Sequence, residues 1–251
     1  MLKLFSAQQV ILILAFVVLA TSAAISWTID LFGAENQTLF GHWRMVGFAV
    51  FGIFLAVTHP IVWRWFWSVP GVGRILSTQI VPDLTGFWKF TVQSNYPIIA
   101  ALKAERGLVQ SDTGLSEYVF IGFLRQGWLT SDFEVFGHDG SILDSSDTLL
   151  VEFRPGPNKR KKKIFWFYEQ TNKLVDKGDS GTFQGASELE IQRPTLITGL
   201  TWSNRNWENG GNTAGPIRLE RLEKAPLKGM SDDALSERAV KLYREIEAAV
   251  A

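Results

Sequence analysis

Side chains able to recognise a ligand gather in the segment Thr201–Arg221, whose sequence is TWSNRNWENGGNTAGPIRLER. Trp202, Arg205 and Trp207 lie within it, among several asparagines. Aromatic faces stack on planar rings and cations, and a guanidinium binds phosphate oxygens through two parallel hydrogen bonds. These residue types suit a nucleobase and a phosphate. A polar loop whose tryptophans are buried in the fold is the simpler interpretation of the same residues.

Two further residues join this candidate ligand-binding set. Tyr168 is expected to stack on a base, as the two loop tryptophans do, and Arg125 is expected to hold a phosphate together with Arg205. Whether either side chain points toward a ligand depends on strand register, because a slip of one residue reverses the face of a strand.

Patterns typical of catalysis or metal binding are missing from the sequence. His42, His59 and His138 have no metal-ligand spacing, and there is no cysteine. Residues Gly178–Gly181 read GDSG, the string around a trypsin-type serine, but the matching histidine motif is missing and a glycine-rich turn explains the string better. Neither a phosphate-binding Walker loop nor a dinucleotide-binding glycine motif occurs. We therefore expect a protein that is not an enzyme, with no catalytic residue, metal or cofactor.

Charge offers one local feature in a chain whose formal net charge is zero. Lys159–Lys163 reads KRKKK and is expected at the tip of a hairpin. Such a run is either a solvated turn or, beside a membrane, a contact for anionic headgroups. DNA or RNA polymers are not expected as partners, because no aromatic side chains are interleaved with these cations.

Two apolar stretches predict a transmembrane helical hairpin over residues 1–68. Ala7–Ile29 contains no charged side chain and is long enough to cross a bilayer, although a cleaved signal peptide is a competing interpretation. Met45–Trp63 contains no Lys, Arg, Asp or Glu and forms the second predicted span. Lys3 precedes the first span and Arg64 follows the second, so the positive-inside tendency places both termini in the cytoplasm.

After a linker at residues 69–82, the hydrophobic period changes from helical to the alternation of strands. Eight short segments alternate and are mostly separated by turn residues, a pattern typical of a closed antiparallel barrel or a sandwich. The expected strands are Gly86–Gln93, Glu117–Gln126, Trp128–Phe136, Thr148–Arg154, Lys163–Gln170, Thr182–Gln192, Leu196–Ser203 and Ile217–Leu222. A final amphipathic helix at Ser231–Val250 is expected to dock on the barrel or to mediate self-association.

The first of these strands opens with Gly86-Phe87-Trp88. A glycine there lets the chain bend under the sheet, while the indole can plug one end of a barrel. An ordinary first strand with a core tryptophan is the simpler alternative. Trp88 is nevertheless kept among the candidate ligand-binding residues.

Four segments together resemble a known family. They are the N-terminal hairpin, LTGFWKFTVQSNY, FQGASELEI and TWSNRNW followed by NTAGPIRLERL, and they span residues 1 to about 222. In this order they resemble the two-transmembrane, β-strand-rich effectors of CBASS, the cyclic-oligonucleotide-based anti-phage signalling system of bacteria. The resemblance implies an eight-stranded lipocalin-like barrel that binds a cyclic dinucleotide made by a partner nucleotidyltransferase. It also implies ligand-induced homo-oligomerisation and disruption of the inner membrane, which aborts the infection.

The sequence thus predicts four parts: a transmembrane hairpin at 1–68, a linker at 69–82, a ligand-binding β-barrel at 83–224 and a C-terminal helix at 230–251. The expected location is the bacterial inner membrane, with both termini and the barrel on the cytoplasmic side. The alternative is a membrane-tethered barrel that acts as a scaffold or binds a lipid or another small hydrophobic molecule.

Overall fold

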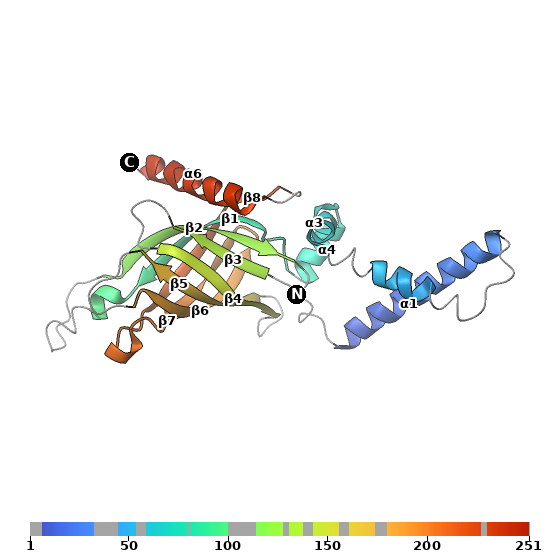
Figure 1. Cartoon of the computed structure of the whole chain (residues 1–251), viewed down its shortest axis with the longest axis horizontal. Coiled ribbons are helices and arrows are strands. Elements are labelled where there is room, and N and C mark those ends of the chain that lie inside the picture. The colour runs from blue at the N-terminus through green and yellow to red at the C-terminus, as the bar shows by residue number, and fades with distance from the viewer. Residues whose placement is uncertain are drawn as a thin grey trace.

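Eight antiparallel strands form a closed barrel that carries helices at its N-terminal and C-terminal sides (Figure 1). The structure, a computed structural model, describes residues 7–32, 45–53, 59–79, 81–99, 114–127, 131–137, 143–155, 161–173, 180–226 and 230–250. The strands are β1 (Gly86–Ser94), β2 (Ser116–Gln126), β3 (Ser131–Phe136), β4 (Leu143–Pro155), β5 (Lys162–Asn172), β6 (Thr182–Arg193), β7 (Leu196–Ser203) and β8 (Ala214–Lys224). The prediction of an eight-stranded antiparallel barrel is confirmed.

Each strand pairs with its neighbour in sequence, and β1 pairs with β8 to close the barrel. Closure leaves no free sheet edge, so each strand has a hydrogen-bonded neighbour on both sides. Gly86 begins β1 where the chain passes against β8, and a Cβ atom there would lie 2.2 Å from the carbonyl oxygen of Glu223. Only glycine allows this approach, which explains the glycine ahead of Trp88.

The two ends of the barrel differ, and we name them by their residues. The closed end holds residues 81–85 before β1, the β6–β7 turn at 194–195 and residues 225–226 after β8. The mouth holds residues 95–99 after β1 and residues 204–213 between β7 and β8. The N-terminal helices lie beyond the closed end, so the mouth faces away from them (Figure 1).

Helix α6 (Asp232–Val250) docks on the outer face of the barrel, against β2 and β3. Leu235, Ala239 and Leu242 are buried against Phe87 and Phe123 of the barrel wall. These helical positions fall on one stripe, so the helix buries its apolar side and leaves its polar side to solvent. The docking interpretation of this helix is therefore confirmed.

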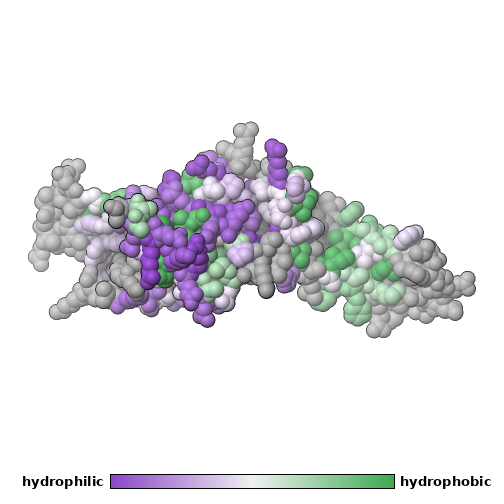
Figure 2. Space-filling view, turned by 90° about the horizontal axis from the view of Figure 1, so that it is seen from above, coloured by the Kyte–Doolittle hydropathy of each residue, from purple (hydrophilic) through white to green (hydrophobic). Residues whose placement is uncertain are grey.

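The N-terminal part contains helix α1 (Ala7–Phe32), a helical stretch at residues 45–53, α3 (Pro60–Ser68) and α4 (Val72–Gln79). Hydrophobic residues gather over this part, whereas hydrophilic side chains cover much of the barrel in the same view (Figure 2). The structure describes the side chains of residues 15–27 in α1. Among all the residues described in this way, no helix is both long enough and apolar enough to span a membrane. The second predicted span, Met45–Trp63, lies partly outside the described residues. The predicted linker at 69–82 is not irregular throughout, because α4 occupies most of it.

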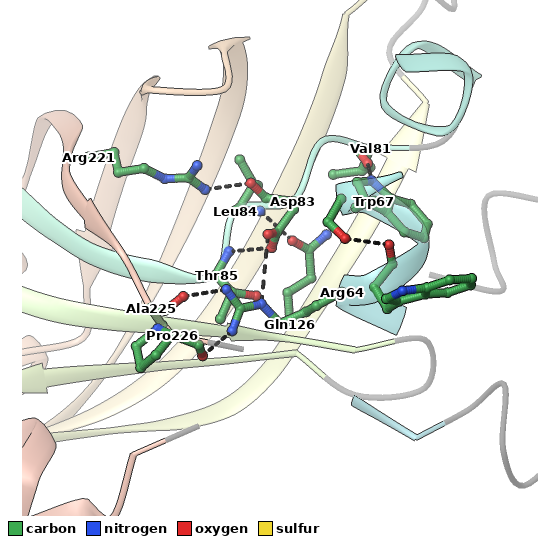
Figure 3. Close-up of polar contacts among 12 residues, drawn as sticks. Arg64, Trp67, Val81, Asp83, Leu84, Thr85, Gln126, Arg221, Ala225 and Pro226 are labelled. Atoms are coloured by element: carbon green, nitrogen blue, oxygen red, sulfur yellow. Dashed lines mark hydrogen bonds and ion pairs between the residues drawn. The ribbon is translucent and has the colours of Figure 1, made fainter. Parts of the chain in front are cut away.

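The closed end is joined to α3 by buried polar contacts (Figure 3). The Arg64 guanidinium, only 8% exposed, donates to the carbonyl oxygens of Ala225 and Pro226, and its Nε lies 3.8 Å from Asp83 Oδ2. One turn further along, the Trp67 indole donates to the carbonyl oxygen of Val81 over 2.9 Å. Because these contacts bridge segments far apart in sequence, they fix the direction in which α3 leaves the barrel.

Candidate ligand-binding site

The mouth of the barrel contains a cavity of about 100 Å³, counted as space open to the centres of water molecules. Its lining combines apolar and aromatic side chains with a smaller number of polar ones. Apolar and aromatic lining residues include Phe90, Val92, Tyr118, Phe120, Val135, Leu143, Trp166, Tyr168, Phe183, Trp202 and Ile217, and polar ones include Ser146, Gln170, Thr201, Ser203, Arg205 and Thr213. Such a lining suits a ligand with one planar apolar part and one polar or charged part.

Aromatic rings in contact form one side of the cavity. The rings of Trp166 and Tyr168 lie 4.5 Å apart, and Phe90 meets Trp166 edge-on at 5.9 Å. Tyr168 lies over Gly185 of the neighbouring strand, where a Cβ atom would come within 2.2 Å of the tyrosine ring. The Trp166 indole donates to Thr148 Oγ1 over 3.0 Å, which fixes its orientation. The result is a rigid aromatic surface on which a planar ring can stack.

Hydroxyl groups connect β5, β6 and β7 beside this surface. Tyr168 Oη and Thr201 Oγ1 are 3.1 Å apart, and Ser187 Oγ donates to Thr201 Oγ1 over 2.9 Å. Burial raises the pKa of Tyr168, while its hydrogen bond to Thr201 acts in the opposite direction. The phenol is therefore neutral near pH 7 and can both donate and accept hydrogen bonds.

Arg205 supplies a cation at the rim of the cavity. Its guanidinium carbon lies 5.4 Å from the centre of the Tyr96 ring and 5.5 Å from that of Phe183. These distances are typical of cation–π contacts, which help to hold the side chain in place. A guanidinium held in this way can bind an anionic group with little further loss of side-chain freedom.

The loop that carries Arg205 is itself fixed by hydrogen bonds. Asn204 Oδ1 accepts from the backbone N–H of Gln184 over 2.8 Å, and Asn95 Oδ1 accepts from that of Ala214 over 2.8 Å. Asn206 adopts a left-handed backbone conformation with φ of 47°, which asparagine tolerates better than most residues. These asparagines therefore shape the mouth and hold the loop that presents Arg205.

The two loop tryptophans occupy different positions. Trp202 borders the cavity but leaves 44% of its surface exposed, because its neighbours Thr201 and Ser203 are the inward-facing residues of β7. Trp207 lies in the short helical turn η2 (Trp207–Asn209), 64% exposed and outside the cavity lining. Trp202 is thus beside the site, and Trp207 can reach a ligand only if the ligand extends above the rim.

The structure does not bring Arg125 and Trp88 to the cavity. Arg125 lies on the outer face of β2, where its guanidinium is 3.3 Å from Asp232 at the start of α6 and 3.9 Å from Glu134. Trp88 is completely buried near the closed end, with its indole donating to the carbonyl oxygen of Leu84 and the Arg221 guanidinium 4.9 Å from its ring. Neither side chain therefore lines this cavity, and Trp88 instead fills the barrel core near the closed end.

Several cavity residues were not expected from the sequence. Ser146, Gln170, Thr201, Ser203 and Thr213 are small polar residues of a kind that occurs throughout the chain, so no motif distinguishes them. One of them could have been inferred from strand alternation. Every second residue of a strand faces the same side, so Gln170 follows Trp166 and Tyr168 on the inner face of β5. Ser146 is of interest because it is only 4% exposed and its Oγ has no hydrogen-bond partner among the described residues. A buried hydroxyl without a partner is costly, so a ligand group that pairs with it gains free energy.

No protein-family model matches this chain, and a comparison with curated proteins finds no match. The architecture therefore rests on the strand pairing described above.

Proposed function

We propose that this protein is a membrane-anchored receptor whose barrel mouth binds a cyclic dinucleotide and that it acts as an effector of CBASS anti-phage signalling. The observation that carries the proposal is the pairing of an aromatic wall, formed by Trp166 and Tyr168, with a guanidinium, that of Arg205, at the rim of one cavity. A nucleotide needs both features, a surface for its base and a cation for its phosphate. The eight-stranded barrel agrees with the fold that the motif resemblance implies.

The size of the cavity limits how such a ligand sits. A cavity of about 100 Å³ is smaller than the roughly 300–1,000 Å³ of typical sites for drug-sized ligands. It has room for one base, so the second base and the phosphates would lie over the rim. That arrangement places a phosphate near Arg205 and brings the exposed Trp202 and Trp207 within reach of the second base.

The polar lining favours a nucleotide over the alternative ligand, a lipid or other small hydrophobic molecule. A site for a purely apolar ligand gains nothing from hydroxyl and amide groups, because each must lose its hydration to be covered. The mouth carries several such groups together with Arg205.

The remaining parts of the proposal concern the membrane. The uncharged stretch Ala7–Ile29 and the apolar stretch from Met45 would form the anchor in the inner membrane, with the barrel in the cytoplasm. Binding of the messenger, made by a partner nucleotidyltransferase, would favour a homo-oligomer whose hairpins disrupt the bilayer. For this to occur, the ligand must bind the assembled form more tightly than the free form. The messenger is bound and not turned over, since the proposed activity needs no catalysis.

Calorimetric titration of the full chain in lipid nanodiscs tests the proposal against a panel of cyclic di- and trinucleotides. We expect one nucleotide to bind with micromolar or tighter affinity. Arg205→Ala should weaken its affinity by about 10- to 100-fold, because charge-assisted hydrogen bonds contribute roughly 1.5–3 kcal/mol. Arg125→Ala is the matched control and should leave affinity unchanged, since Arg125 lies on the outer face.

Two outcomes would contradict the proposal. If the folded chain binds none of the nucleotides but does bind a fluorescent fatty acid, the lipid-binding alternative is favoured. Equal weakening by Arg205→Ala and Arg125→Ala would show that the nucleotide binds somewhere other than the mouth.

A further inference from the structure

Exposed apolar side chains gather on the two short helices beneath the closed end of the barrel. Trp65 of α3 is 55% exposed, and Val72 and Ile75 of α4 are 39% and 63% exposed. Single exposed hydrophobic residues are ordinary, but here three of them occur within eleven residues of sequence. Helices with an exposed apolar side and neighbouring cations are typical of segments that lie in the interface of a bilayer.

Cations surround these helices at the same end of the barrel. Lys161, Lys162 and Lys163 follow the β4–β5 connection, and Arg193 lies at the β6–β7 turn. Lys162 Nζ donates to the carbonyl oxygen of Ser77 over 3.0 Å, which ties the β4–β5 connection directly to α4. The basic segment therefore lies directly beside α4.

Carboxylates pair with two of these lysines. Lys161 pairs with Glu190 at 2.6 Å, and Lys163 pairs with Glu188. In sequence, Lys159 and Arg160 directly precede the three lysines, so the run Lys159–Lys163 consists entirely of cations. The segment that contacts α4 is thus strongly basic.

We propose that α3, α4 and residues Lys161–Lys163 form a membrane platform that rests on a bilayer surface containing anionic lipid headgroups. Trp65 and Ile75 insert at the boundary between headgroups and acyl chains, and the lysines lie at the level of the lipid phosphates. An anionic bilayer is the occupant that matches both properties of the surface, its positive charge and its apolar side chains. The inference rests on the proposed membrane anchorage, which places a bilayer beside α3.

The platform has a structural consequence for the receptor. Arg64 and Trp67 of α3 are hydrogen-bonded to the closed end of the barrel, so a platform held on the bilayer also holds the barrel. Because the mouth lies at the opposite end, it would point into the cytoplasm, open to a soluble ligand (Figure 1).

The lack of cysteine in the chain allows a spin label to be placed at a single position. We would compare Ile75→Cys with Leu200→Cys in the full chain, since Leu200 is 58% exposed on the barrel wall and serves as the matched control. In nanodiscs containing phosphatidylglycerol, the label at position 75 should collide with oxygen more than with a water-soluble nickel complex. The label at position 200 should show the reverse.

Charge dependence is tested with two matched double variants. The label at position 75 partitions between a lipid-facing and a water-facing position. The double variant Lys161→Gln with Lys163→Gln should shift this partition toward water by about fivefold or more, since each cation near an anionic surface contributes on the order of 1 kcal/mol. Lys173→Gln with Lys241→Gln removes two exposed lysines away from the platform and should leave that partition unchanged.

The outcomes separate this inference from the proposed function. A water-exposed label at position 75 in an inserted chain that still binds nucleotide overturns the platform alone. A lipid-facing label in a chain that binds none of the nucleotides tested supports the platform and overturns the receptor proposal. Release of the whole chain from membranes by alkaline carbonate overturns the anchorage and the platform together.

Discussion

The two ends of the barrel are built from the same eight strands but are filled differently. At the closed end a completely buried Trp88 stacks under the Arg221 guanidinium, whose Nη2 donates to the carbonyl oxygen of Asp83 over 2.6 Å. At the mouth, positions that face inward carry hydroxyl and amide side chains, and a cavity remains. The closed end is thus completely filled, whereas the mouth keeps open space.

The difference shows how one barrel can combine a packed end with an open cavity. A core packed with large side chains has no room for a ligand, and a hollow one loses the free energy that packing supplies. Here the closed end is filled by fully buried side chains such as Trp88 and Leu84, whereas a cavity remains at the mouth. The opposite end can therefore leave space and polar groups without unfolding the whole barrel.

The largest effect should come from removing the tryptophan at the closed end. Trp88→Ala deletes a fully buried indole and leaves Arg221 without its aromatic partner, so we expect a loss of about 3–5 kcal/mol in the free energy of unfolding. Trp202→Ala at the mouth, where the indole is 44% exposed, should cost less than about 1 kcal/mol. Denaturant unfolding of both variants measures the difference, and equal losses would contradict the division between the two ends.

Arg64→Ala should have the next largest effect, a loss of about 3 kcal/mol. The change leaves the Asp83 carboxylate without its nearest cation and two buried carbonyl oxygens without a donor. Arg154→Ala is the control, because that arginine is 60% exposed and pairs with Glu152 on the surface, where such pairs contribute little. If both variants unfold at the same denaturant concentration, the polar junction in Figure 3 does not stabilise the closed end.

The sequence predicted the strands well but predicted the site only in part. Alternation defined most strands to within a few residues, since a half-buried strand repeats every two residues. It failed to orient Arg125, because α6 covers the outer face of β2, so outward-facing Phe123 is buried as well as inward-facing Leu124. A strand that is apolar on both faces carries no period-two signal, so the outward direction of its arginine could not be read.

A similar ambiguity affected β5, where Ile164, Trp166 and Tyr168 point inward while Phe165 and Phe167 point outward. Aromatic residues on both faces left the register open. The polar lining from β7 and from Thr213 was also not predictable, because serine and threonine occur on the outside of the barrel as well as inside. Arg205 was found because a cation between aromatic and asparagine residues is a rarer combination.

At the mouth, Gly185→Ala should cost about 1–3 kcal/mol, which places it between the changes at the closed end and simple surface changes. Its new methyl group would overlap the Tyr168 ring, which must then move into the cavity. We expect the free energy of nucleotide binding to fall by more than the free energy of unfolding, since the displaced ring occupies the space of the base. Unfolding and calorimetric titration of the same variant measure the two effects, and an unchanged affinity would place the ligand elsewhere.

The smallest expected effect concerns the pairing of α6 with the barrel. Arg238 donates hydrogen bonds to Glu223, and this contact lowers the pKa of the glutamate in the folded state. A lowered carboxyl pKa stabilises the fold above the unfolded value near 4.5, and this contribution is lost as the pH falls through the folded pKa. Arg238→Ala should therefore cost at most about 1 kcal/mol at pH 7 and almost nothing at the acid end, because the pair is partly exposed. Unfolding curves between pH 7 and pH 3 measure the difference; a constant difference across that range would mean that Arg238 stabilises the docked helix through packing rather than through its charge.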